Sequence, residues 1–271
     1  MSNTPKIQDD SVAAPVAVRA AWLADGRGAC FAPGVLVLRG HTVVAAGSPE
    51  SVGVPGGAVT WVDASDSAVM PALVNAHTHL DLTLVPRIPE PEHFFQWLGG
   101  VRSARLSMTA DDVRQSVLAG VQRLDAGGVA AVGDIAGTHA LLASLAACAD
   151  MGLEGCVFEE VFGMGPRVAA CLAAMEAMTL EAAGHARGIR RGVQPHAPYS
   201  SDRRVFEAAL RSGAPVSTHL AESVDKLRSV GRDFLCRRPP SDRLDGRTAP
   251  GRGSRFGRTT DARPVRPPQR Y

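Results

Sequence analysis

Residues 69–82 read VMPALVNAHTHLDL, an apolar segment of strand-like composition that ends in two histidines separated by one residue. Because successive side chains of a strand point to opposite faces, residues two apart share a face. His77 and His79 can therefore present both imidazoles to one divalent ion. We interpret the pair as part of a metal site, in preference to two partly exposed loop histidines.

Downstream of this segment, helix-like and strand-like patterns alternate. A helix is predicted to begin at Thr109 as N-cap, with Asp111 and Asp112 in its first turn, and to end at Gly127 and Gly128. Further strands are expected over residues 129–134, 154–162, 189–195 and 214–220, with helices between them. Such alternation favours right-handed βαβ units and a parallel sheet. With the opening segment as the first, we count five strands, whereas a closed (β/α) barrel needs eight.

The regions on either side of this alternating part differ from it in composition. Residues 15–62 hold short strand-like pieces between glycine and proline turns, typical of a small antiparallel β unit. Residues 231–271 have no apolar periodicity and are dense in Arg, Pro and Gly, which predicts disorder. The predicted organisation is α/β: a disordered N-terminus over 1–13, an N-terminal β-sandwich portion over 14–67, an incomplete TIM-like barrel over 68–230 and a disordered basic tail over 231–271.

Charge and cysteine usage limit the compartment and the partners. The net charge of +2 hides a split, because the tail carries 11 Arg and 4 Asp, leaving 18 basic and 23 acidic residues in the first 230. The five cysteines form no CxxC pair, and the polar, acidic start of the chain lacks the features of a signal peptide. We expect a cytoplasmic protein with no membrane partner.

Two further motifs follow later strands. The segment STHLAES places His219 at the end of the fifth predicted strand and Glu222 three residues on, where a carboxylate can exchange protons beside a metal-bound imidazole. The segment GVQPHAPYS, residues 192–200, holds His196 after a strand between prolines 195 and 198, which suits a residue that hydrogen bonds to a substrate. Taken alone, each histidine would more often be structural.

Together these segments resemble the amidohydrolase superfamily, specifically its branch of aromatic amine deaminases and triazine chlorohydrolase-like enzymes. The resemblance runs from about residue 14 to about residue 225 and includes VDASDSAVMPALVNAHTHLDL, VAAVGDIAG, GVQPHAPYS and STHLAES in that order. It implies a metal-dependent hydrolase of a non-peptide C–N bond, most plausibly one that deaminates a nucleobase-like or other heterocyclic amine. Family members are often homodimers.

The resemblance also assigns roles to residues. It implies that His77, His79 and His219 ligate one divalent ion, zinc first and iron as the alternative, that Glu222 moves protons, and that His196 contacts the substrate. The segment 86–105, PRIPEPEHFFQWLGGVRSAR, corresponds to a region that covers the substrate in relatives. Trp97, with Phe94 and Phe95, could there form an apolar wall for a flat ring, and ordinary helix packing is the equal alternative. Glu159 and Glu160 either support a ligand or are solvated.

The chain departs from the family pattern after residue 225. The family has a histidine at the sixth strand and an aspartate at the eighth, and the aspartates of the tail lie where nothing would position them. We therefore expect a truncated, weakly active or inactive chain with open sheet edges and poor solubility. An altered reading frame explains the abrupt loss of Lys and Glu in the tail and is the favoured interpretation.

The alternative is a non-catalytic metal-binding remnant whose genuine basic tail binds nucleic acid or another polyanion. The segment GRGSRFGR offers arginines with one aromatic residue. Stacking platforms need more than Phe256 and Tyr271, so nucleic acid is not the partner that we expect; a small heterocyclic substrate is.

Overall fold

The computed structural model of the chain describes residues 13–53, 58–88, 94–137, 139–181, 188–220 and 222. The chain divides into two units, Met1–Gly231 and Arg232–Tyr271. The expected disorder of the basic tail and of residues 1–12 lies outside the described residues.

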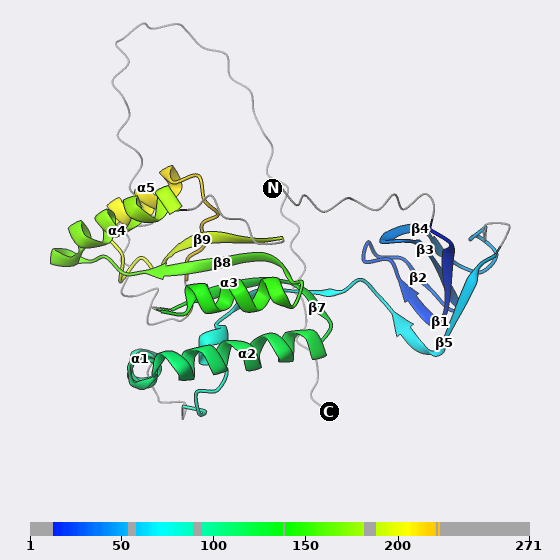
Figure 1. Cartoon of the computed structure of the whole chain (residues 1–271), viewed down its shortest axis with the longest axis horizontal. Coiled ribbons are helices and arrows are strands. Elements are labelled where there is room, and N and C mark those ends of the chain that lie inside the picture. Colours follow the sequence, from blue (N-terminus) through cyan, green and yellow to red (C-terminus); the bar gives the residue numbers. More distant parts are fainter. Residues whose placement is uncertain are drawn as a thin grey trace, which may run out of the picture. The chain divides into compact units, whose positions relative to one another are not determined.

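A five-stranded sheet forms the N-terminal part of the chain (Figure 1). Its strands are β1 (Pro15–Ala24), β2 (Cys30–Phe31), β3 (Gly34–Arg39), β4 (Thr42–Gly47) and β5 (Thr60–Val69). Strand β1 pairs antiparallel with β2 and β3, and β3 pairs antiparallel with β4. The small core of this sheet consists of apolar side chains from β1, β3 and the segment after β4: Ala17, Val35, Val37 and Val52.

One expectation for this region is corrected. The unit is not purely antiparallel, because β5 runs parallel to β1, with Val16 opposite Thr60. A parallel neighbour needs a long connection, and residues 48–59 between β4 and β5 provide one. Strand β5 ends at Val69, and the next strand begins at Leu73.

The second sheet is parallel, as the alternating pattern predicted. Its strands β6 (Leu73–Thr78), β7 (Val129–Ala136), β8 (Glu154–Val161) and β9 (Ile189–Pro195) lie side by side in sequence order. Figure 1 labels the last three of them. The expected fifth strand over residues 214–220 is reduced to an isolated parallel bridge between Val193 and Val216. The Val193 N–H donates to the Pro215 carbonyl (2.9 Å), and the Ser217 N–H donates to the Val193 carbonyl (3.1 Å). This segment therefore lies beside β9 without forming a regular ladder.

Helices connect these strands: α1 (Phe94–Ser107), α2 (Ala110–Ala126), α3 (Leu141–Asp150), α4 (Val168–Glu181) and α5 (Arg203–Arg211). Two short 3-10 helices, η2 (Leu80–Leu82) and η3 (Gly165–Arg167), follow β6 and β8. The predicted start of α2 is confirmed: Thr109 is its N-cap and forms a capping box with Asp112, and Gly127 is its C-cap. Among the helices of the described residues, none combines the length and the hydropathy that a membrane span requires.

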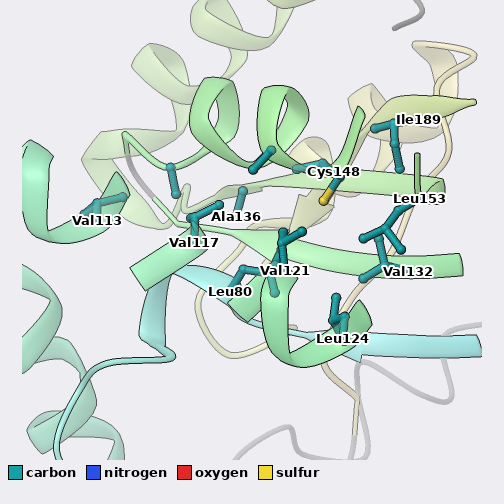
Figure 2. Packing of buried hydrophobic residues seen from close by; sticks show 13 residues of the cluster. Leu80, Val113, Val117, Val121, Leu124, Val132, Ala136, Cys148, Leu153 and Ile189 are labelled. Atoms are coloured by element: carbon teal, nitrogen blue, oxygen red, sulfur yellow. The ribbon is translucent and has the colours of Figure 1, made fainter. Parts of the chain in front are cut away.

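Helices α2 and α3 pack on the parallel sheet through one apolar cluster (Figure 2). Val113, Val117 and Val121 recur every four residues along α2, so they share one helix face, and all three are buried. They meet Leu80 from η2 and Val132 from β7. The turn that follows β6, which begins with the residue after His79, is therefore part of the main core.

Candidate metal centre

The segment that follows β6 is held by contacts from β7 and α2. The Leu80 N–H donates to Asp134 Oδ1 at the end of β7 (2.9 Å), and Ser116 on α2 accepts from the Leu84 N–H (2.9 Å). A Cβ on Gly120 would lie 2.7 Å from Leu80 Cδ2, so glycine allows α2 to approach this turn closely. Leu80 itself is buried. These contacts fix the backbone that carries His79.

Three histidines converge at this end of the sheet. His77 is in β6, His79 follows that strand, and His219 comes from the segment beside β9. One ring nitrogen from each lies within 4.8 Å of those of the other two. The ring centroids are 5.0 to 5.4 Å apart. The side chains that the sequence predicted as ligands are thus brought together, with His77 exposed and His219 buried.

Backbone carbonyls orient two of these rings. His79 Nδ1 lies 3.1 Å from the Ile135 carbonyl, and His219 Nδ1 lies 3.0 Å from the His196 carbonyl. A ring that donates from Nδ1 to a carbonyl keeps its Nε2 as a lone-pair donor, which is how metal-binding histidines are commonly oriented. Burial, with the nearby Arg105, His219 and His77, lowers the pKa of His79 to about 3. This imidazole is therefore neutral at physiological pH, the form that binds a metal.

The donor set fits a divalent transition metal. Three neutral imidazoles whose nitrogens lie within 4.8 Å of one another match the three protein ligands of catalytic zinc sites, which leave further positions open. Imidazole also suits iron, so these ligands do not select between zinc and iron.

His196, which the sequence analysis predicted to contact the substrate, lies beside this cluster. Its Nδ1 contacts Ser200 Oγ at 2.6 Å, and its Nε2 lies 3.8 Å from Glu160 Oε1. Its ring is 5.0 Å from that of His219 and 4.6 Å from that of Phe162. Glu160, His196 and His219 form a second set of three side chains whose ligand atoms lie within 4.8 Å of one another.

Of the two remaining predicted site residues, Glu222 contacts this cluster, and Trp97 makes its ring contact with Phe94 on its own helix. Glu222 is exposed, and its Oε1 is 3.9 Å from His219 Nε2. Trp97 on α1 is 37% exposed and packs its ring against Phe94 at 5.6 Å. The neighbouring Phe95 contacts Tyr199, whose ring in turn contacts His196. In the described residues, Phe95 rather than Trp97 connects α1 to the histidines through ring contacts.

Sequence reasoning missed several polar residues that are buried around the site. Asp81 follows β6, Asp134 is near the end of β7, and Arg105 is near the end of α1. Gln194 in β9 places its side-chain amide group 2.9 Å from His219 Nδ1. Burial raises the pKa of Asp134 to about 6, and it also raises the pKa values of Asp81 and Glu160 against the lowering effect of Arg105. The signal for Asp81 and Asp134 was their position at strand ends. Arg105 gave no comparable signal.

Comparisons with known proteins agree with this arrangement. The model of the amidohydrolase family matches residues 68–238. An aminodeoxyfutalosine deaminase of Deinococcus radiodurans is 30% identical over 210 residues, which cover 74% of this chain and 48% of that protein. A 5-methylthioadenosine/S-adenosylhomocysteine deaminase of Symbiobacterium thermophilum is 28% identical over 220 residues, which cover 77% and 49%. The chain spans about half the length of these relatives.

Solved structures are similar in fold. An adenosine deaminase from Xanthomonas campestris with bound zinc superposes with a TM-score of 0.63 at 20% identity, covering 79% of this chain and 51% of that one. A guanine deaminase from C. acetobutylicum with bound guanine superposes with a TM-score of 0.65 at 13% identity, covering 80% and 55%. At these identities the likeness shows the fold alone. It supports an α/β architecture with a parallel, barrel-type sheet preceded by a β portion.

Proposed function

The chain belongs to the amidohydrolase family, and on that premise we propose that its function is the metal-dependent hydrolysis of a non-peptide C–N bond. We place the reaction at the amino group of a nucleobase-like or other heterocyclic amine. The observation that carries the proposal is the convergence of three imidazoles at one end of the parallel sheet. The names of the relatives, which include deaminases of adenosine-type compounds, support the choice of substrate class.

In this proposal His77, His79 and His219 hold one divalent ion, zinc or alternatively iron. An ion of this kind, when bound, would lower the pKa of a water molecule that it binds, so that hydroxide is available near neutral pH. The carbonyl contacts of His79 and His219 keep both rings oriented before an ion arrives. Preorganised ligands of this kind do not have to be ordered when the ion binds.

Two side chains then act on the substrate. Glu222, whose carboxylate is exposed and 3.9 Å from His219 Nε2, carries a proton to the departing amino group. His196, fixed by Ser200 at 2.6 Å, hydrogen bonds to the heterocycle. Phe95 and Tyr199 offer apolar ring faces next to His196 for a flat substrate, and Trp97 extends that wall through Phe94.

For the chain as sequenced we propose weak activity or none. No aspartate of the described residues joins the three histidines in one ligand group. The family resemblance assigns an aspartate to that centre, where its carboxylate would complete the ligand set and accept a proton. A chain without it is expected to bind the ion less tightly and to hydrolyse substrate slowly.

Metal analysis of the purified full chain tests the first part of the proposal. We expect close to one equivalent of zinc or iron after reconstitution, falling to near zero in His77→Ala and His219→Ala. His41, exposed in the turn between β3 and β4, provides the control His41→Ala, which should retain the ion. Equal metal content in all four proteins would contradict the assignment.

Ammonia release tests the second part. The reconstituted chain is incubated with adenosine-type and guanine-type amines and with a peptide amide as a negative substrate. Slow release from a heterocyclic amine that disappears in Glu222→Gln supports the proposal. Release from the peptide alone, or release unaffected by removal of the metal, would contradict it.

A further inference from the structure

A buried cluster of charged side chains lies next to the histidines, and the roles proposed above do not use it. Arg105, near the end of α1, binds Asp81 through its Nε (2.9 Å to Oδ2) and its Nη2 (3.1 Å to Oδ1). Its Nη1 donates to Glu160 Oε2 at 2.7 Å. The Asp81 and Glu160 side chains are 1% and 2% exposed, and the Arg105 side chain is 20% exposed. One guanidinium therefore joins two buried carboxylates.

This cluster connects the ends of three strands. Asp81 follows β6 and Glu160 is near the end of β8, while Gly137 follows β7 between them. A Cβ on Gly137 would lie 2.6 Å from Asp81 Oδ2 and 2.7 Å from Arg105 Cζ. The absence of a side chain at the end of β7 thus makes room for the guanidinium to reach across that strand.

Both carboxylates lie close to residues of the metal centre. Asp81 is two residues beyond His79, in the same short turn. The second oxygen of Glu160, Oε1, lies 3.8 Å from His196 Nε2. A guanidinium that holds both carboxylates therefore sets the separation between a predicted ligand on one strand and the predicted substrate-binding histidine on another. The planar, fork-like geometry of arginine is suited to such a double contact.

We propose that Arg105 is a positioning residue of the metal centre, which fixes His79 and His196 relative to each other by binding Asp81 and Glu160 across the end of β7. The role rests on the proposed function and deepens it, because α1, which also carries Phe95, becomes the element that aligns ligand and substrate groups. A cluster that only stabilises the fold would leave the two histidines where they are when the guanidinium is removed. The two possibilities therefore differ in a measurable way.

The test compares Arg105→Met, Arg105→Lys and Gly137→Ala with the wild-type full chain. The control is Arg102→Met on the exposed face of the same helix, since Arg102 has no ion pair with the described residues. Circular dichroism selects the variants that fold. Competition against a chromophoric chelator measures zinc affinity, and the visible absorption of the Co²⁺-substituted chain reports the ligand geometry.

We expect Arg105→Met to lose at least tenfold in zinc affinity and to change the Co²⁺ absorption, while Arg102→Met matches the wild type. Arg105→Lys retains the charge but loses the fork, so partial recovery is expected. Gly137→Ala leaves every charged group in place and forces the Asp81 and Arg105 side chains apart, so it should reproduce a weaker form of the Arg105→Met effect.

Nitrogen-15 spectra of the histidine rings in the metal-free chain separate this proposal from the proposed function. Because Arg105 Nη2 lies 3.4 Å from His79 Nδ1, loss of the guanidinium by itself shifts the His79 signals. The readout of the positioning role is therefore His196, whose ring signals should shift in both Arg105→Met and Gly137→Ala while those of His41 stay unchanged. If the wild type binds no metal but these shifts occur, the metal site fails and the positioning role stands. The positioning role is overturned if folded variants keep wild-type His196 ring signals and zinc affinity, or if all three variants fail to fold.

Discussion

Strands β6 and β9 both lead into the candidate site, yet their surroundings differ. In β6, Leu73 is 47% exposed and Val74 is 69% exposed, and within the described residues the strand pairs only with β7. In β9, Val193 and Gln194 are buried, and the strand lies between β8 and the segment around Val216. Two of the three predicted ligands nevertheless come from β6 and the residue that follows it.

This difference shows that a predicted metal ligand can be positioned by the turn that follows a strand instead of by the strand itself. His196 is placed by a buried strand, whereas His79 is placed by the turn that follows β6. There Leu80 enters the core, and Asp134 accepts a hydrogen bond from its N–H. Changes to the turn should therefore be costly, and changes to β6 itself should be mild.

The largest expected effect follows from shortening the side chain that anchors the turn. Leu80→Ala removes a fully buried side chain and should lower the free energy of unfolding by about 2–5 kcal/mol. Val74→Ala, on the exposed strand, should change it by no more than about 0.5 kcal/mol. Urea unfolding of both variants measures this. If both variants lost a similar free energy of unfolding, the side chains of the strand and of its turn would contribute equally to stability, which would contradict this comparison.

The pH dependence of stability sharpens the comparison at Asp134. Burial raises the pKa of Asp134 from 3.8 to about 6. Between these pH values the folded chain holds a proton that the unfolded chain releases. The contribution of Asp134 to the free energy of unfolding therefore falls as the pH rises from 3.8 to about 6. Burial lowers the pKa of His79 from 6.5 to about 3, so its contribution rises with pH over the overlapping window. The two effects oppose each other.

Asp134→Asn removes the first effect and leaves the second. The stability of the metal-free variant should therefore rise more steeply between pH 4 and pH 6 than that of the wild type. Urea unfolding at several pH values in the presence of a chelator measures the slope, and Asp150→Asn, at an exposed position, provides the control. An unchanged or shallower slope would contradict the assignment to Asp134.

A smaller effect is expected at the start of α2, the helix that supports the turn. Thr109→Ala removes the hydroxyl that accepts from the Asp112 N–H and should cost about 1 kcal/mol. Thr109→Ser keeps the hydroxyl and should recover most of the loss. Thermal unfolding followed by circular dichroism compares the two variants. If serine gives no recovery, the cap does not stabilise the helix.

The smallest effect on stability is expected on the exposed strand. Val74→Lys places a charge on β6 and should leave the free energy of unfolding within about 0.5 kcal/mol of the wild type. It should also reduce self-association, because charged residues on edge strands oppose edge-to-edge pairing. Size-exclusion chromatography over a range of concentrations tests this. More aggregation in the variant would show that Val74 is covered in solution.

Much of the local structure could be predicted because it depends on short-range signals. The strand expected over 189–195 is β9 with those bounds, and the N-cap at Thr109 follows from residue types within one helical turn. The parallel pairing of β5 with β1 could not be predicted, because composition favours a strand without naming its neighbour. Residues 214–220 have strand-like composition but form only one bridge, since regular pairing depends on the partner strand.

The sequence by itself determined the family, the alternation of helices and strands, and the histidines that could bind a metal, because these features depend on residue types at fixed spacings along the chain. The resemblance implied that His77, His79 and His219 share one ion, and the tertiary structure places a ring nitrogen of each within 4.8 Å of those of the other two. Only the tertiary structure decided that Arg105 joins Asp81 to Glu160 beside them. The physical reason is that ion pairs and ligand sets depend on distances between strand ends. Those distances are set by how the sheet and the helices pack.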